Sequence, residues 1–287
     1  QNAQLRNYTT TGGEKKLARY RWSWEKKFNG GLTDDHSNLF ALVDAMNTGS
    51  AGSSAYHEAV DALVDVEQWA RVFATRRIVA DWDGYSYSRG KNQFMYLPNG
   101  GKWQMLLWDL DFSLGGGSRE ASEGLFSGVN DSVISKFYNH PAFRRAYLRA
   151  MSDALDSVLT DGKMHPVMDA NYAALQANGV NAANPNAIKT WVRQRRSTMQ
   201  TAVDQANAAF QITTSNGADF SSANNLVRLE GTAPVSVRTI TVNGIAYPVE
   251  WTSVNRWRVS LALEPGANDL SLAGLGSTGQ ALEGVRD

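Results

Sequence analysis

The sequence of 287 residues contains no cysteine, which excludes disulfide bonds, thiolate chemistry and zinc sites with cysteine ligands. It has no surplus of either charge, because 28 lysines and arginines balance 28 aspartates and glutamates. A balanced chain has no bulk attraction to nucleic acid or to an anionic membrane. No stretch approaches the roughly 20 apolar residues that a membrane-spanning helix needs. Any function must therefore come from a local site.

The overall amino-acid composition is that of a globular protein. Hydrophobic residues make up 43% of the chain and charged residues 20%, and the length is sufficient for two domains. The chain begins at Gln1 and has no signal-peptide pattern, so we expect a processed or trimmed piece of a longer protein. The lack of cysteine fits an exported bacterial protein as well as a cytosolic one. We expect an extracellular or cell-surface location in a bacterium.

The first two thirds of the chain have the apolar periodicity of helices. Hydrophobic side chains recur every three or four residues over 39–46, 57–80 and much of 131–210. Pro141 suits the first position of one helix, and Pro166 is expected to open another. Residues 1–210 are therefore predicted to form a mostly helical domain.

A short β-hairpin is predicted to interrupt the helices. Residues 93–97 have the pattern of a strand, Pro98-Asn99-Gly100-Gly101 that of a turn, and 102–109 that of the return strand. Such a hairpin would carry Asp109 and Asp111 to the end of a strand. The fold class expected for the whole chain is α+β.

The composition changes after residue 210. Polar and apolar residues alternate over 236–242 and again over 257–261, and Asn243-Gly244 is a strong hairpin turn. Short strands with frequent turns predict a β-sandwich of immunoglobulin-like type over residues 211–287.

The most informative polar residues gather around the predicted hairpin: Asp81, Asp83, Asn92, Asp109 and Asp111. Phosphoryl transfer needs a carboxylate that orients and deprotonates the acceptor, and hard oxygen ligands that hold Mg²⁺ on the phosphates. Protein kinases supply these groups as an aspartate, a later asparagine, and a second aspartate after a hairpin. Asp83, Asn92 and Asp109 occur here in the same order.

Two considerations bear on Asp109 and Asp111. An isolated Asp-x-Asp is often a solvated turn or a helix cap. In a strand, however, side chains alternate between faces, so these two carboxylates would lie on the same face. Neighbouring carboxylates repel each other, and a bound cation is the usual reason to keep them together. We therefore expect Asp109 and Asp111 to be metal ligands.

Several segments together resemble a known family. The segments NQFMYL and GKWQMLLWDLDFSLG are similar to the strands of the CotH-like spore-coat protein kinases, which carry an NyyLY-type strand and a WDLD-type strand ending near a glycine. The segment VDVEQWARVFATRRIVADWDGY resembles the family's helix that leads to its first active-site aspartate. The segments NHPAFRRAYLRAM and WVRQRRSTMQTAV resemble two later helices. The resemblance covers roughly residues 35–208.

The resemblance implies a kinase C-lobe-like domain that binds ATP and Mg²⁺ and phosphorylates a protein, which in spore-coat members is another coat protein. Asp83 matches the catalytic aspartate, and Asn92 matches the amide that follows it. Asp109 matches the metal-binding aspartate, so Asn92 and Asp109 would hold the magnesium nucleotide. Asp111 is a second candidate ligand. Cell-surface or coat proteins are the expected partners.

The chain departs from a complete kinase upstream of these residues. No glycine-rich loop precedes a strand, so we expect the nucleotide-clamping lobe to be truncated and phosphate transfer to be incomplete in this fragment. One alternative is therefore an inactive pseudokinase or scaffold portion of a large secreted surface protein. Another is a carbohydrate-active enzyme with paired carboxylates, which predicts an open aromatic groove around Asp83 and Asp109. The kinase hypothesis predicts that Asp83, Asn92 and Asp109 converge around one cation.

Overall fold

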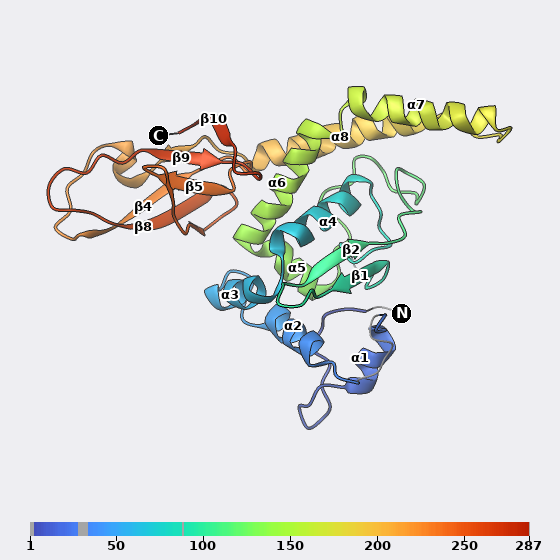
Figure 1. Ribbon diagram of the computed structural model, residues 1–287, viewed down its shortest axis with the longest axis horizontal. Helices are drawn as coiled ribbons and strands as arrows, with labels where there is room; N and C mark the ends of the chain where they lie inside the picture. The colour runs from blue at the N-terminus through green and yellow to red at the C-terminus, as the bar shows by residue number, and fades with distance from the viewer. Residues whose placement is uncertain (1–2, 28–33, 88, 287) are drawn as a thin grey trace.

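The computed structural model describes residues 3–27, 34–87 and 89–286. Within these residues a helical region is followed by two antiparallel four-stranded sheets, which lie together at the left end of the molecule in Figure 1, while helix α7 extends at the right end. The predicted α+β class is confirmed. The immunoglobulin-like type of the second part and the boundary at residue 210 stay predictions. Among the described residues, no helix has the length and apolar character required to cross a membrane.

The helical region consists of helices α1 to α8 and one hairpin. The helices are α1 (Leu17–Ser23), α2 (Ser37–Asn47), α3 (Ser54–Leu63), α4 (Val66–Ile78), α5 (Ser132–Asn139), α6 (Pro141–Ser157), α7 (Asp161–Ala177) and α8 (Asn186–Ala206), and the hairpin strands are β1 (Gln93–Tyr96) and β2 (Gln104–Leu107). Buried aromatic side chains, including Trp69 and Phe73 of α4 and Phe143 and Tyr147 of α6, form the centre of the core. Helix α4 thus packs against α6 and ends beside the hairpin (Figure 1).

The predicted continuous helix over 57–80 is two helices, α3 and α4. The backbone of Trp103 lies against the junction: its N–H donates to Leu63 O at 2.7 Å, and its carbonyl accepts from Asp65 N at 3.1 Å. The Asp65 carboxylate then caps α4 by accepting from Gln68 N at 3.0 Å. The hairpin therefore takes backbone groups that a continuous helix would have used, which periodicity alone does not reveal.

Of the two predictions about prolines at helix starts, one is confirmed and one is wrong. Pro141 occupies the first turn of α6, as predicted. Pro166 lies inside α7, which begins at Asp161, so the prediction that it opens a helix is wrong. Helix α7 projects from the molecule with α8 (Figure 1) and has no buried residue. Water can therefore reach the carbonyl of Gly162 that Pro166 leaves without an N–H partner.

The second part of the chain has one core between two sheets. One sheet has the order β3 (Gln211–Ile212), β4 (Leu226–Thr232), β8 (Arg256–Ala262), β7 (Glu250–Trp251), and the other has the order β10 (Ala281–Arg286), β9 (Leu272–Leu275), β5 (Thr239–Val242), β6 (Ile245–Ala246). Leu229 and Trp257 of the first sheet pack with Ile240 and Leu272 of the second. The strands alternate between buried and exposed residues in β4 and β8, as the sequence pattern predicts. We call this part the β domain.

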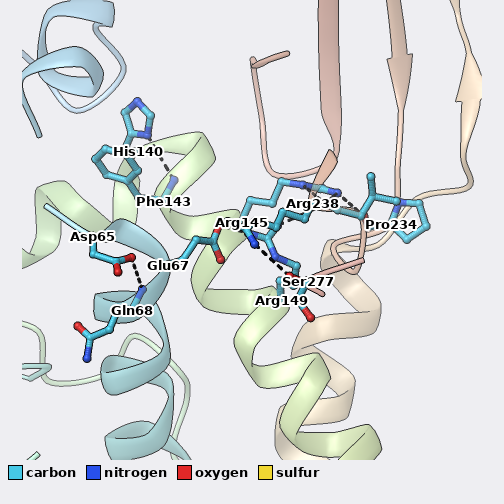
Figure 2. Close-up of polar contacts among 11 residues, drawn as sticks. Asp65, Glu67, Gln68, His140, Phe143, Arg145, Arg149, Pro234, Arg238 and Ser277 are labelled. Carbon is cyan, nitrogen blue, oxygen red and sulfur yellow. Dashed lines mark hydrogen bonds and ion pairs between the residues drawn. The ribbon is translucent and has the colours of Figure 1, made fainter. Parts of the chain in front are cut away.

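A buried arginine joins the β domain to the helices. Arg145 of α6 is 1% exposed, and it extends with Arg149 toward the β domain (Figure 2). Its guanidinium donates to four backbone carbonyl oxygens of the β domain, those of Ala233, Pro234, Val237 and Val254. It also lies 3.5 Å from the centre of the Trp251 ring. Since Val235 packs into the helical core, the two parts share a buried interface.

His140 predicts a pH dependence of stability. It caps α6, where its Nδ1 accepts from Phe143 N at 3.4 Å (Figure 2), and the His57 ring lies 5.0 Å away. Burial, and secondarily the charge of His57, lowers the pKa of His140 from 6.5 to about 4. The unfolded chain therefore binds more protons between these two values, and the stability that neutral His140 contributes is lost as the pH falls through this window.

Between about pH 7 and about pH 5, this histidine should lower the free energy of unfolding by about 2 kcal/mol. The measurement is urea denaturation across that range for the wild type and for His140→Asn, which keeps a capping side chain but cannot titrate. The asparagine variant should lose less stability on acidification. Parallel pH profiles for the two proteins would show that His140 is not responsible.

Candidate functional site

The last turn of α4 carries an arginine that organises the candidate site. Arg76 is fully buried and forms an ion pair with Asp81. The same guanidinium donates to the carbonyl of Asn92 and, at 2.9 Å, to that of Trp108. Arg76 therefore connects the loop after α4, the segment entering β1 and the segment leaving β2.

The charges around Arg76 compensate for its burial. Burial lowers the pKa of Arg76, whereas Asp81 first, and then Asp109 and Asp83, raise it. Burial likewise raises the pKa of Asp81, and Arg76 opposes that change. Arginine stays protonated in proteins, so the pair is ionic. Asp81 thus supports the loop, and Asp83 and Asp109 both lie within the electrostatic reach of one buried cation.

Asp83 is 4% exposed, and its two carboxylate oxygens have different surroundings. Oδ2 forms an ion pair with Lys91 Nζ at 2.7 Å and accepts a hydrogen bond from Asn92 Nδ2 at 3.2 Å. Asn92 Nδ2 also donates to the carbonyl of Asp83 at 2.9 Å. Oδ1 is buried and accepts no hydrogen bond from the described residues. Arg89 Nε lies 3.9 Å from Oδ1, too far for a hydrogen bond. Oδ1 therefore keeps an unused acceptor position.

Asp109 and Asp111 do not share a strand face, so that expectation is wrong. Strand β2 ends at Leu107, and Asp109 has a φ of 54° outside it. Arg76 holds the carbonyl of Trp108, and Leu114 N donates to Val79 O at 2.7 Å, which turns the segment back over the end of α4. The alternation of a strand therefore stops before the carboxylates. Both side chains belong to exposed residues.

The structure thus pairs Asp83 with Asn92 directly and places Asp109 near them through Arg76. Among the residues that the structure describes, no hydrogen bond or ion pair connects Asp111 to the site. Within the ranges 3–27, 34–87 and 89–286, no three histidine, aspartate or glutamate residues are placed to hold a metal ion. Magnesium needs fewer protein ligands than that, because it keeps several waters and binds through one or two carboxylates together with substrate phosphates. Asp109 and the amide oxygen of Asn92 fit that role, because Asn92 uses its amide nitrogen for Asp83.

The sequence pattern did not indicate two residues of this site, Arg76 and Lys91. Arg76 lies within a helix, where a charged side chain is usually exposed. Its position among the apolar residues of α4 could have indicated its burial, because Arg76 and Arg77 are both buried there. Lys91 directly precedes Asn92, yet its ion pair with Asp83 depends on how the loop folds. Neither spacing nor residue type predicts that contact.

The fold and the order of these residues define a kinase-like domain: a buried aspartate, the asparagine bonded to it, and a second aspartate after a hairpin. A family model described as CotH kinase protein matches residues 2–205. The chain therefore belongs to the CotH kinase family. The match includes the hairpin and helices α1 to α7, reaches the last turn of α8 and ends before β3. No match to a curated protein was found.

Proposed function

We propose that this domain transfers the terminal phosphoryl group of ATP to a hydroxyl group of a protein, with Asp83 as the base. The observation that carries the proposal is the asymmetry of the Asp83 carboxylate, in which Oδ2 is held by Lys91 and Asn92 while buried Oδ1 lacks a donor. A hydroxyl group hydrogen-bonded to Oδ1 would be oriented for attack on the γ-phosphorus. A general base acts on a group within hydrogen-bond distance, which this contact would provide.

In this reaction the hydroxyl proton passes to Asp83 Oδ1 as the hydroxyl oxygen forms a bond to the γ-phosphorus. The bond between the γ-phosphorus and the bridging oxygen breaks, and ADP leaves with its electron pair. A magnesium ion would neutralise charge on the phosphates when bound. Asp109 and Asn92 would supply its protein ligands, with Asp111 as a further candidate. Lys91 forms an ion pair with Asp83 Oδ2 and would lie beside the reacting carboxylate.

The family membership favours this function over the carbohydrate-active alternative. An inactive scaffold with the same fold is the remaining alternative. A location outside the cell and a coat or surface protein as the acceptor stay predictions from the resemblance.

Magnesium-dependent nucleotide binding tests the proposal. Asp109→Asn should weaken ATP binding in the presence of Mg²⁺ about tenfold, because a neutral amide is a poorer magnesium ligand than a carboxylate. Calorimetric titration with and without Mg²⁺ measures the change. Asp61→Asn is a matched control, since Asp61 is exposed and pairs with Lys102 away from the site. Wild-type protein that binds ATP no better with Mg²⁺ than without it would support the scaffold instead.

A further inference from the structure

Two exposed or half-exposed cations lie beside the Asp83 carboxylate, and a third lies near the ring of its neighbour Trp82. Lys91 pairs with Asp83, and Arg89 lies 3.9 Å from its unpaired oxygen with half of its side chain exposed. Arg119 approaches from another segment, and its guanidinium lies 5.7 Å from the centre of the Trp82 ring. The guanidinium of Arg89 lies 5.1 Å from the centre of the same ring. One indole therefore gathers two arginines beside the candidate catalytic carboxylate.

The Trp82 ring beside the two arginines is closely packed. Trp82 stacks on Phe112 with 5.5 Å between ring centres. Gly117 packs so closely that a Cβ atom there would lie 2.6 Å from Trp82 Nε1. Arginine stacks well on an aromatic face and keeps its N–H groups directed outward. Both guanidinium groups therefore lie beside one closely packed indole.

These donors are only partly used. Arg119 pairs with Glu123 at 3.1 Å, while Arg89 is too far from Asp83 for a hydrogen bond. Both guanidinium groups lie within 6 Å of the same ring centre, so one anion beside Trp82 could be contacted by both. Since the whole chain has a net charge of zero, the attraction is local to the candidate site.

We propose that Arg89 and Arg119 recognise carboxylate side chains that flank the acceptor hydroxyl, so that the preferred acceptor is an acidic peptide segment. This inference rests on the proposed function, because that function places the hydroxyl at Asp83 Oδ1, next to Arg89. Guanidinium groups bind carboxylates through two parallel hydrogen bonds, which gives both affinity and register. The arginines would therefore fix which hydroxyl of the segment meets Asp83.

Peptide binding without nucleotide tests the inference separately from catalysis. Two fluorescent peptides of equal length are titrated with the full chain, one with a serine flanked by aspartate and glutamate, the other with a serine flanked by lysine. The acidic peptide should bind about tenfold more tightly at low salt, with a preference that shrinks as salt is added. The double variant R89E/R119E should reverse the preference, and R89Q/R119Q should abolish it.

The variant K102E/R193E is the matched control. It makes the same change of charge at exposed ion pairs of other segments, with Asp61 and Asp161, and should keep the wild-type preference. Equal binding of the two peptides by the wild type would overturn the inference. So would a R89E/R119E protein that loses ATP affinity but keeps its preference for the acidic peptide, which would assign the arginines to the nucleotide. Failure of phosphate transfer to both peptides, with the binding preference intact, would count against the proposed function alone.

Discussion

Arg145→Met should lower the free energy of unfolding by about 4 kcal/mol and the melting temperature by about 10 °C. Methionine fills much of the same volume but donates no hydrogen bond. The four carbonyl groups that Arg145 bonds lie at the interface between the helices and the β domain. Two of them belong to fully buried residues, Ala233 and Val237. Buried acceptors that lose their donor are costly, and the stacking on Trp251 is lost as well.

The measurement is chemical denaturation of the full chain followed by tryptophan fluorescence and circular dichroism. Arg144→Met is a close control, because Arg144 is the preceding residue of α6 and its guanidinium packs 4.2 Å from the ring centre of Phe126 instead. That substitution should cost about 1 kcal/mol. Arg145→Lys should stay well below wild-type stability, since one ammonium group cannot reach four carbonyls. Equal effects of the two methionine substitutions would show that the carbonyl contacts contribute little.

This interface also marks a limit of what the sequence could predict. Strong periodicity and turn chemistry indicated most of the helices, the hairpin and the change to strands after residue 210, but not α1 or the break between α3 and α4. Arg145, by contrast, directly follows a second arginine, Arg144, and its partners are about ninety or more residues away in the chain. Burial of such a side chain depends on tertiary contacts, which local patterns do not encode.

The candidate site was likewise predicted from the sequence only in part. The order of Asp83, Asn92 and Asp109 was visible in the sequence, and the bond between Asp83 and Asn92 agrees with the expected closeness of these two residues. The shared strand face of Asp109 and Asp111 was wrong, because a buried arginine draws the backbone out of the strand at Trp108. The spacing of Asp109 and Asp111 predicted that they lie near the site, but long-range hydrogen bonds determine how the backbone orients them.

If Asp83 is the base, Asp83→Asn should slow phosphate transfer about a thousandfold or more while leaving Mg-ATP affinity nearly unchanged. Asparagine keeps the size of the side chain and can still interact with Asn92, but it cannot accept the hydroxyl proton. Single-turnover transfer from labelled ATP to a serine peptide measures the rate, and calorimetry measures nucleotide binding. The two readouts separate loss of chemistry from loss of binding.

Lys91→Met provides the second comparison at the same carboxylate. Lys91 contacts Oδ2 and leaves Oδ1 untouched, so its loss should slow transfer about tenfold, less than the loss of the base itself. A thermal melt of each variant shows whether the buried loop still folds. If folded Asp83→Asn protein transfers phosphate at the wild-type rate, Asp83 is not the base. If instead both variants lose activity equally, the ion pair as a unit, rather than the free oxygen of Asp83, would be what the reaction requires.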